Sequence, residues 1–175
     1  HRLPGNDPHI WLDPLNAQKI TQNLVQILSE FDSENAQTYH SNGKKTILRL
    51  FDLHIQLKTK MSSVSSKSYI VFHDAYQYFE KRYQLNPIAS VIVSSGPSTS
   101  VGRLIDIRKK IKNKNVLCIF TEPQFSPKLV QTVISGTAVK KGILDPIGTS
   151  ISPGPEMYFT LLNNISHSIS SCFKK

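Results

Sequence analysis

The sequence predicts an α/β fold in which a four-stranded parallel sheet is flanked by helices and preceded by one long helix. Four short runs rich in β-branched and aromatic residues alternate with stretches of helical periodicity, a pattern typical of parallel sheets with right-handed crossovers. The predicted strands are 69–72, 88–93, 116–120 and 139–144. The helices expected after them are 75–83, 100–111, 126–134 and 156–171.

Two helices are expected before the first strand. The first covers 16–31, after a Pro14 entry, and repeats apolar residues at helical spacing. The second covers 33–64, with a cap at Asp32 and Ser33 and only Gly43 interrupting the pattern. About 30 helical residues extend roughly 45 Å, more than a small domain needs internally, so we expect this helix to connect two lobes.

These elements divide the chain into three parts. Residues 33–64 are the predicted connecting helix, residues 1–32 precede it, and residues 65–175 contain the predicted strands and form an α/β lobe.

Composition narrows the class of protein. The 175 residues carry 21 Lys and Arg against 12 Asp and Glu, a net charge of +9. Five of these cations lie within 108–114, where no aromatic residue is interleaved as a nucleic-acid stacking surface requires, so we interpret the charge as solvated surface. No apolar run approaches the roughly 18 residues of a membrane-spanning helix.

The two cysteines, Cys118 and Cys172, match no zinc knuckle and no redox motif. Their spacing leaves open one bridge or two buried thiols.

Polar side chains follow three of the predicted strands. His73 and Asp74 follow the first, Glu122 the third and Asp145 the fourth, and the carboxyl ends of parallel strands share one edge of the sheet. An imidazole with carboxylates at such an edge suits a divalent metal. His9, just ahead of the first helix, is a further candidate ligand. The competing interpretation is that these residues cap helices and form turns.

Four ordered motifs carry a resemblance to a known family. They are Asp7-Pro8-His9-Ile10-Trp11-Leu12-Asp13-Pro14, Phe72-His73-Asp74-Ala75-Tyr76-Gln77-Tyr78-Phe79, Thr121-Glu122-Pro123-Gln124-Phe125 and Leu144-Asp145-Pro146-Ile147-Gly148. Together they resemble the metal-binding periplasmic and lipoprotein family of ABC transporter substrate-binding proteins, most of all its zinc-specific branch.

The resemblance implies two α/β lobes joined by one long rigid helix, with the metal held between them. It assigns His9, His73 and Asp145 as ligands, and a His at 73, where manganese-favouring members often have Glu, points to zinc. Asp74 and Glu122 are expected to orient the histidine rings. Cys118 and Cys172 resemble a pair that bridges a strand and the last helix, which implies an oxidising compartment.

As a whole, the resemblance implies high-affinity capture of zinc outside the cytoplasm and delivery to an ABC permease. The resemblance implies that the chain is a carboxyl-terminal portion of such a protein, with 1–32 the remnant of its amino-terminal lobe and the helix at 16–31 exposing an apolar face that this lobe would cover. It also implies a monomer that is periplasmic or anchored to a membrane and is not an enzyme. The alternatives are a manganese-binding homologue, a zinc-dependent hydrolase and a basic nucleic-acid-binding module. The sequence contains neither a His-Glu-x-x-His nor a Gly-x-Ser-x-Gly motif, either of which would favour the hydrolase.

Overall fold

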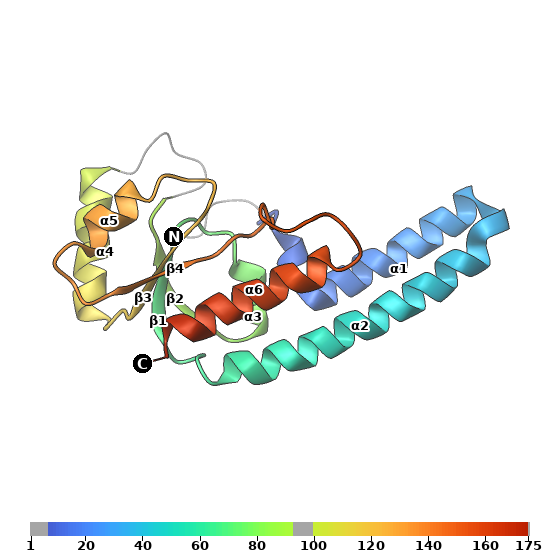
Figure 1. Ribbon diagram of the computed structural model, residues 1–175, viewed down its shortest axis with the longest axis horizontal. Coiled ribbons are helices and arrows are strands. Elements are labelled where there is room, and N and C mark those ends of the chain that lie inside the picture. The colour runs from blue at the N-terminus through green and yellow to red at the C-terminus, as the bar shows by residue number, and fades with distance from the viewer. Residues whose placement is uncertain (1–6, 93–99, 175) are drawn as a thin grey trace.

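A parallel four-stranded sheet lies between two layers of helices (Figure 1). This computed structural model describes residues 7–92 and 100–174. The strands are β1 (Ser68–Val71), β2 (Asn86–Ser90), β3 (Cys118–Thr121) and β4 (Lys140–Ile143). Their order across the sheet is β2-β1-β3-β4, and every neighbouring pair is parallel. The predicted fold class is confirmed.

Two helices precede β1 and four follow the strands in turn, as the sequence predicts, with shifts of one to three residues at their ends. They are α1 (Pro14–Phe31), α2 (Ala36–Ser62), α3 (Gln77–Arg82), α4 (Val101–Asn113), α5 (Lys128–Ile134) and α6 (Met157–Cys172). Two short 3₁₀ turns, η1 (Ile10–Leu12) and η2 (Ser33–Asn35), precede α1 and α2.

Each face of the sheet has its own hydrophobic core. Successive side chains of a strand point to opposite faces, so β1 sends Tyr69 and Val71 into one core and Ile70 into the other. The first core packs against α2, α3 and α6, and the second against α4 and α5 (Figure 1). Because both faces of the sheet are covered, the strand ends that carry polar side chains are held in fixed positions.

The edge strand β2 begins earlier than predicted. Its bounds are Asn86–Ser90 rather than 88–93, because Pro87, which lacks an N–H, is tolerated at an edge. The pairing nevertheless continues past the strand, since the Val91 and Ile92 N–H groups donate to Val71 and Phe72 carbonyls of the β1 side. The predicted end of the strand, Val93, lies outside the described residues.

The long helix also begins later than predicted. The turn η2 occupies residues 33–35, and the Asp32 carboxylate accepts hydrogen bonds from Asn35 and the Tyr39 hydroxyl instead of capping α2 through a backbone N–H. From there α2 runs antiparallel to α1, and this hairpin extends away from the sheet (Figure 1). Gly43 faces Val25, where any side chain would collide, which explains a glycine in the middle of a helix.

The hairpin exposes apolar side chains, as expected for α1. Their exposed fractions on α1 run from 37% to 88% for Ile20, Leu24, Ile27, Leu28 and Phe31. On α2, Leu48, Phe51 and Ile55 are also exposed. Within the described residues, no helix has both the length and the apolar character needed to cross a bilayer. The division into three parts stays a prediction.

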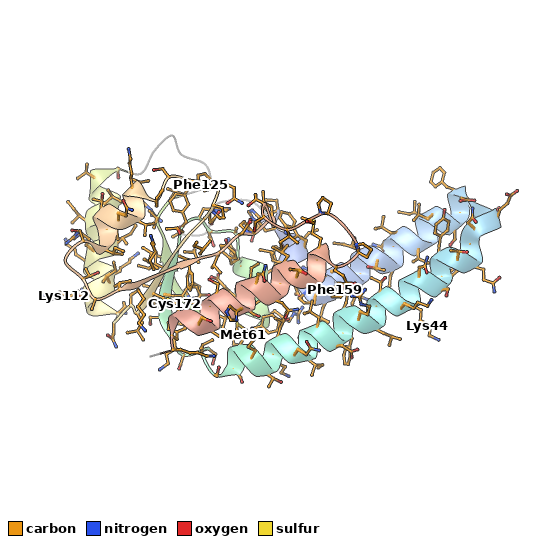
Figure 2. All side chains as sticks on the ribbon, viewed as in Figure 1. Lys44, Met61, Lys112, Phe125, Phe159 and Cys172 are labelled. Atoms are coloured by element: carbon orange, nitrogen blue, oxygen red, sulfur yellow. A yellow bond between two sulfur atoms is a disulfide. The ribbon has the colours of Figure 1, made fainter. Side chains whose placement is uncertain are left out.

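A disulfide joins Cys118 on β3 to Cys172 at the end of α6. Figure 2 shows Cys172 where the last turn of α6 reaches the sheet. The expected bridge is therefore confirmed, and it fastens the final helix to a central strand across 54 residues of sequence.

Removing this bridge is expected to destabilise the fold. In the chain-entropy account, a closed loop of this size stabilises by up to about 4 kcal/mol. The pair Cys118→Ala with Cys172→Ala should lower the free energy of unfolding in urea by a large part of that amount. Wild-type protein refolded in reductant is the control and should behave like the variant. Equal urea midpoints for oxidised wild type and variant would contradict the expectation.

Candidate metal-binding site

The candidate site lies at the carboxyl edge of the sheet, as the strand order requires. His73 comes two residues after β1, and Glu122 directly follows β3, the strand beside β1. His9 comes from the segment just before η1. The structure thus brings together side chains separated by more than a hundred positions in the sequence.

A carboxylate fixes the ring of His73. Its Nδ1 lies 2.6 Å from Glu122 Oε1, and its backbone N–H points to the same oxygen at 3.4 Å. An ionised carboxylate only accepts hydrogen bonds, so Nδ1 carries the proton and donates it. The lone pair of the neutral ring then lies on Nε2, which is the arrangement of carboxylate–histidine pairs in metal centres.

His9 is held in the same way by Asp7. Its Nδ1 lies 2.6 Å from Asp7 Oδ1, and its backbone N–H donates to that oxygen at 3.0 Å. The two imidazole rings lie edge to face, with centroids 5.3 Å apart. The His9 and His73 side chains are 16% and 14% exposed, so solvent reaches both rings. Two imidazole rings, each bound by a carboxylate at Nδ1, therefore lie together at one opening to solvent.

Aromatic rings pack beside the two histidines at this opening. Trp11 packs on His9 with centroids 5.2 Å apart, and Phe125 lies 6.0 Å from His73. Phe125 in turn contacts Phe72 at 4.8 Å. These rings cover the sides of the two imidazoles with apolar surface. The ring nitrogens are then the groups of the two histidines that can bind a ligand.

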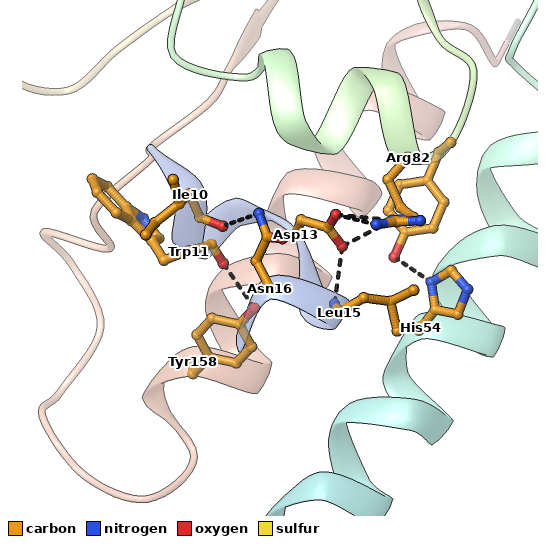
Figure 3. A network of polar contacts seen from close by, with 9 residues as sticks. Ile10, Trp11, Asp13, Leu15, Asn16, His54, Arg82 and Tyr158 are labelled. Carbon is orange, nitrogen blue, oxygen red and sulfur yellow. Dashed lines mark hydrogen bonds and ion pairs between the residues drawn. The ribbon is translucent and has the colours of Figure 1, made fainter. Parts of the chain in front are cut away.

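An ion pair positions the segment that carries His9. Asp13 accepts a hydrogen bond from the Leu15 N–H at the start of α1 and is bound by the Arg82 guanidinium of α3, at 2.6 to 3.0 Å (Figure 3). Asp13 is 3% exposed, so this paired charge is almost fully buried. The pair anchors the beginning of α1 to α3.

Two further hydrogen bonds hold Trp11. Its indole N–H donates to the Pro146 carbonyl at 2.9 Å, and its own carbonyl accepts from the Tyr158 hydroxyl at 2.8 Å (Figure 3 shows the second contact). The turn η1 is therefore fastened both to the loop after β4 and to α6. His9, two residues earlier, is oriented by a rigid neighbourhood.

Asp145 organises a turn. Its two oxygens accept five hydrogen bonds, at 2.6 to 3.2 Å, from the Gln124 side chain, the Ile147, Gly148 and Thr149 N–H groups and the Thr149 hydroxyl. Burial raises the pKa of Asp145, but the hydrogen bonds from Thr149 and Gln124 outweigh it, and the pKa lies below its usual value. A carboxylate with about four lone-pair sites has no acceptor capacity left in this arrangement.

The other sequence candidates are placed differently. Asp74 accepts a hydrogen bond from Gln77, and its pKa is raised by burial and by Asp7 nearby. Within residues 7–92 and 100–174, no three His, Cys, Asp or Glu side chains are arranged to hold one ion. The sequence reasoning missed Asp7 as an orienting group, although an acidic residue two positions before a candidate histidine was a usable signal.

A second buried carboxyl lies behind the site on α3. Glu80 is 6% exposed, and its Oε1 accepts a hydrogen bond from the Tyr69 hydroxyl at 2.9 Å. Burial above all, with smaller contributions from the Asp74 and Asp7 carboxylates, raises the pKa of Glu80 to about 8 against the lowering effect of the Tyr69 hydrogen bond. Glu80 is therefore largely protonated at neutral pH.

Comparison with known proteins places these features in a family. The family described as zinc-uptake complex component A, periplasmic, matches residues 1–172. The high-affinity zinc uptake system protein ZnuA of Brucella suis biovar 1 is 39% identical over 169 residues, which are 97% of this chain and 51% of that protein. The chain spans about half the length of the curated relatives it matches.

Solved structures share the fold. The laminin-binding protein Lbp of Streptococcus pyogenes has a TM-score of 0.83 and 27% identity, over 96% of this chain and 65% of that one. A Zn(II)-bound variant of AdcAII from Streptococcus pneumoniae has a TM-score of 0.79 and 30% identity, over 96% and 62% of the two chains. The arrangement of sheet, helices and hairpin is thus common to both.

The protonation of Glu80 predicts a pH dependence of stability. Its pKa is higher when folded than when unfolded, so its stabilising effect is complete below about pH 4.5 and is lost as pH rises to about 8. The loss is about 1.4 kcal/mol per pH unit in that window. Glu80→Gln should remove this slope, so urea unfolding should find the variant increasingly more stable than wild type from pH 5 to pH 8.

The exposed Glu34→Gln is the matched control and should follow wild type at each pH. A constant difference between Glu80→Gln and wild type from pH 5 to pH 8 would contradict the prediction.

Proposed function

Because the chain belongs to the family of periplasmic zinc-uptake component A proteins, we propose that it captures zinc outside the cytoplasm for an ABC permease. The observation that carries the proposal is the pair His9 and His73, each locked by a carboxylate on Nδ1 with its Nε2 free. Neutral imidazole is a preferred zinc ligand, and the orienting carboxylate raises its basicity. Zinc here is the transported substrate.

The two histidines supply half of a tetrahedral zinc site. Their partly exposed rings leave room for the remaining ligands, which come from water or from the part of the protein that relatives have and this chain does not contain. We therefore assign residues 65–175 to a lobe that offers a half-site, 33–64 to the connecting helix and 1–32 to the end of the other lobe. The apolar face of α1 is then covered in the whole protein.

Asp145 is proposed as a further ligand that binds only after its turn rearranges. At least one of its hydrogen bonds, such as those from Thr149 to Oδ2, must break to free a lone pair. A ligand recruited at this cost contributes less than either histidine.

Zinc is favoured over manganese by the donor atoms. Manganese suits carboxylate, carbonyl and water oxygens, whereas this opening presents two imidazole nitrogens. A manganese-binding homologue remains the alternative that a metal comparison decides.

We also propose that the protein is not an enzyme. A zinc hydrolase needs a base beside its metal-bound water. The two carboxylates nearest the rings, Asp7 and Glu122, each use one oxygen to hold an imidazole. Zinc-dependent hydrolysis of a chromogenic ester would favour the alternative.

We propose that the protein works as a monomer, in the periplasm or at the outer surface of a cell membrane. A structural disulfide persists in oxidising compartments, which supports this location. The permease and zinc are the proposed partners, and nucleic acid is not one. Binding of DNA that weakens with salt would contradict the last point.

A calorimetric zinc titration tests the half-site. The chain should bind one zinc ion, and His73→Ala should weaken binding by more than the roughly 10- to 100-fold that follows loss of an orienting partner. The exposed His167→Ala should bind as wild type does, and manganese should bind more weakly than zinc. Unchanged affinity in both His9→Ala and His73→Ala would refute the assignment.

Asp145→Asn separates the two roles of that carboxylate. The asparagine keeps one acceptor oxygen but loses the charge, so the turn at 145–149 should loosen. The free energy of unfolding should then fall by about 1–2 kcal/mol. Zinc affinity should fall less than in His73→Ala. A loss of affinity equal to that of His73→Ala, with unchanged stability, would show that Asp145 acts as a full ligand and that the turn contributes nothing.

A further inference from the structure

Both carboxylates that orient the histidines leave one oxygen unpaired. Asp7 Oδ2 and Glu122 Oε2 are buried and, among the described residues, have no hydrogen-bond partner. Leaving a buried acceptor without a hydrogen bond is costly, most of all for a charged group. An orienting carboxylate with one free oxygen is also held less firmly than one bound at both.

One buried donor near the site is likewise unpaired. The hydroxyl of Tyr76 makes no hydrogen bond of regular geometry among the described residues, and the side chain is 1% exposed. Burial raises the pKa of Tyr76 well above its usual value, and the nearby Glu122 carboxylate, through its charge and as a hydrogen-bond acceptor, raises the pKa further. An orphaned donor and an orphaned acceptor thus lie beside each other.

The backbone fixes where Tyr76 can act. It follows His73 by three residues, across a turn in which the Ala75 N–H donates to the His73 carbonyl at 3.0 Å. Its ring lies 6.4 Å from the His73 ring, and its carbonyl accepts the Glu80 N–H at the start of α3. Tyr76 is therefore on the same rigid turn as the histidine whose partner it faces.

We propose that Tyr76 is a positioning residue, whose hydroxyl donates to Glu122 Oε2 and so holds Glu122 Oε1 on His73 Nδ1. With both oxygens bound, the carboxylate cannot rotate away, and the His73 ring keeps its proton on Nδ1 and its lone pair on Nε2. The role in zinc binding rests on the proposed function, whereas the role in fixing the tautomer does not.

The competing explanation is that Tyr76 is only a core side chain. Its ring belongs to the same hydrophobic core as Phe79 and Tyr83. Tyr76→Phe keeps the ring and removes the hydroxyl, so it separates the two explanations. Tyr83→Phe is the matched control, because its hydroxyl is also buried but lies 3.3 Å from His54 Nδ1.

The first measurement uses zinc-free protein with ¹⁵N-labelled histidine, at a pH where the rings are neutral. In wild type and Tyr83→Phe, the His73 nitrogens should report the Nδ1–H tautomer. In Tyr76→Phe, the Nε2–H tautomer should rise several-fold. An unchanged His73 tautomer in Tyr76→Phe would overturn the proposal, whether or not the protein binds zinc.

The second measurement is a zinc-affinity cycle. Tyr76→Phe should weaken zinc binding roughly tenfold. Added to Glu122→Gln, it should weaken binding less than twofold, because its effect passes through that carboxylate. Full additivity of the two losses would overturn the proposal. If the wild type binds no zinc while the tautomer shifts as expected, the proposed function fails and the positioning role stands.

A third measurement needs no variant and covers the case in which Tyr76→Phe does not fold. A hydroxyl bonded to a buried carboxylate gives a slowly exchanging downfield proton, which should be assigned to Tyr76 in the wild-type spectrum. A Tyr76 hydroxyl that exchanges rapidly with water in zinc-free and in zinc-treated protein would contradict the bond.

Discussion

The hydrogen bond between Glu122 and His73 is the interaction on which the site depends. It joins the ends of β3 and β1, the two central strands, and it uses both the ring and the backbone N–H of His73. Its geometry is therefore set by the pairing of these strands, which two separate hydrophobic cores hold from opposite faces. The ring of His73 is oriented by the sheet itself, so a disturbance of either core reaches its Nε2, the proposed zinc ligand.

Helix α3 connects the two histidines although it has only six residues. At its last position Arg82 binds Asp13 and so anchors the segment that carries His9. At its N-cap position Tyr76 faces the carboxylate that holds His73. A shift of α3 would thus move both rings together. Burying the Asp13 carboxylate costs desolvation energy, which its partly exposed partner Arg82 offsets, and the pair fixes this relative position.

The sequence predicted the succession of strands and helices along the chain, because periodicity and strand-then-helix alternation are local signals. It also predicted the edge of the sheet at which the site forms. It also identified Glu122, since residues that follow neighbouring parallel strands must meet. It did not reveal Asp7, whose role depends on the turn that returns its side chain to His9. Nor did it reveal that the oxygens of Asp145 accept hydrogen bonds from its own turn, because those bonds depend on the backbone geometry of the turn. The starts of β2 and α2 differed for the same kind of reason, an edge position and a 3₁₀ turn.

Under the proposed function, the two histidines and the Asp145 carboxylate differ in how they affect the release of a captured ion. The two imidazoles are held by carboxylates and by packed aromatic rings. Asp145 has a stable alternative, because its oxygens satisfy the backbone of residues 147–149 when no ion takes them. Under the proposed function, losing the ion costs the Asp145 carboxylate little, because the turn competes with the ion for its oxygens and so favours release. Under the proposed function, capture relies on the two rigid nitrogens and delivery begins at the turn after β4.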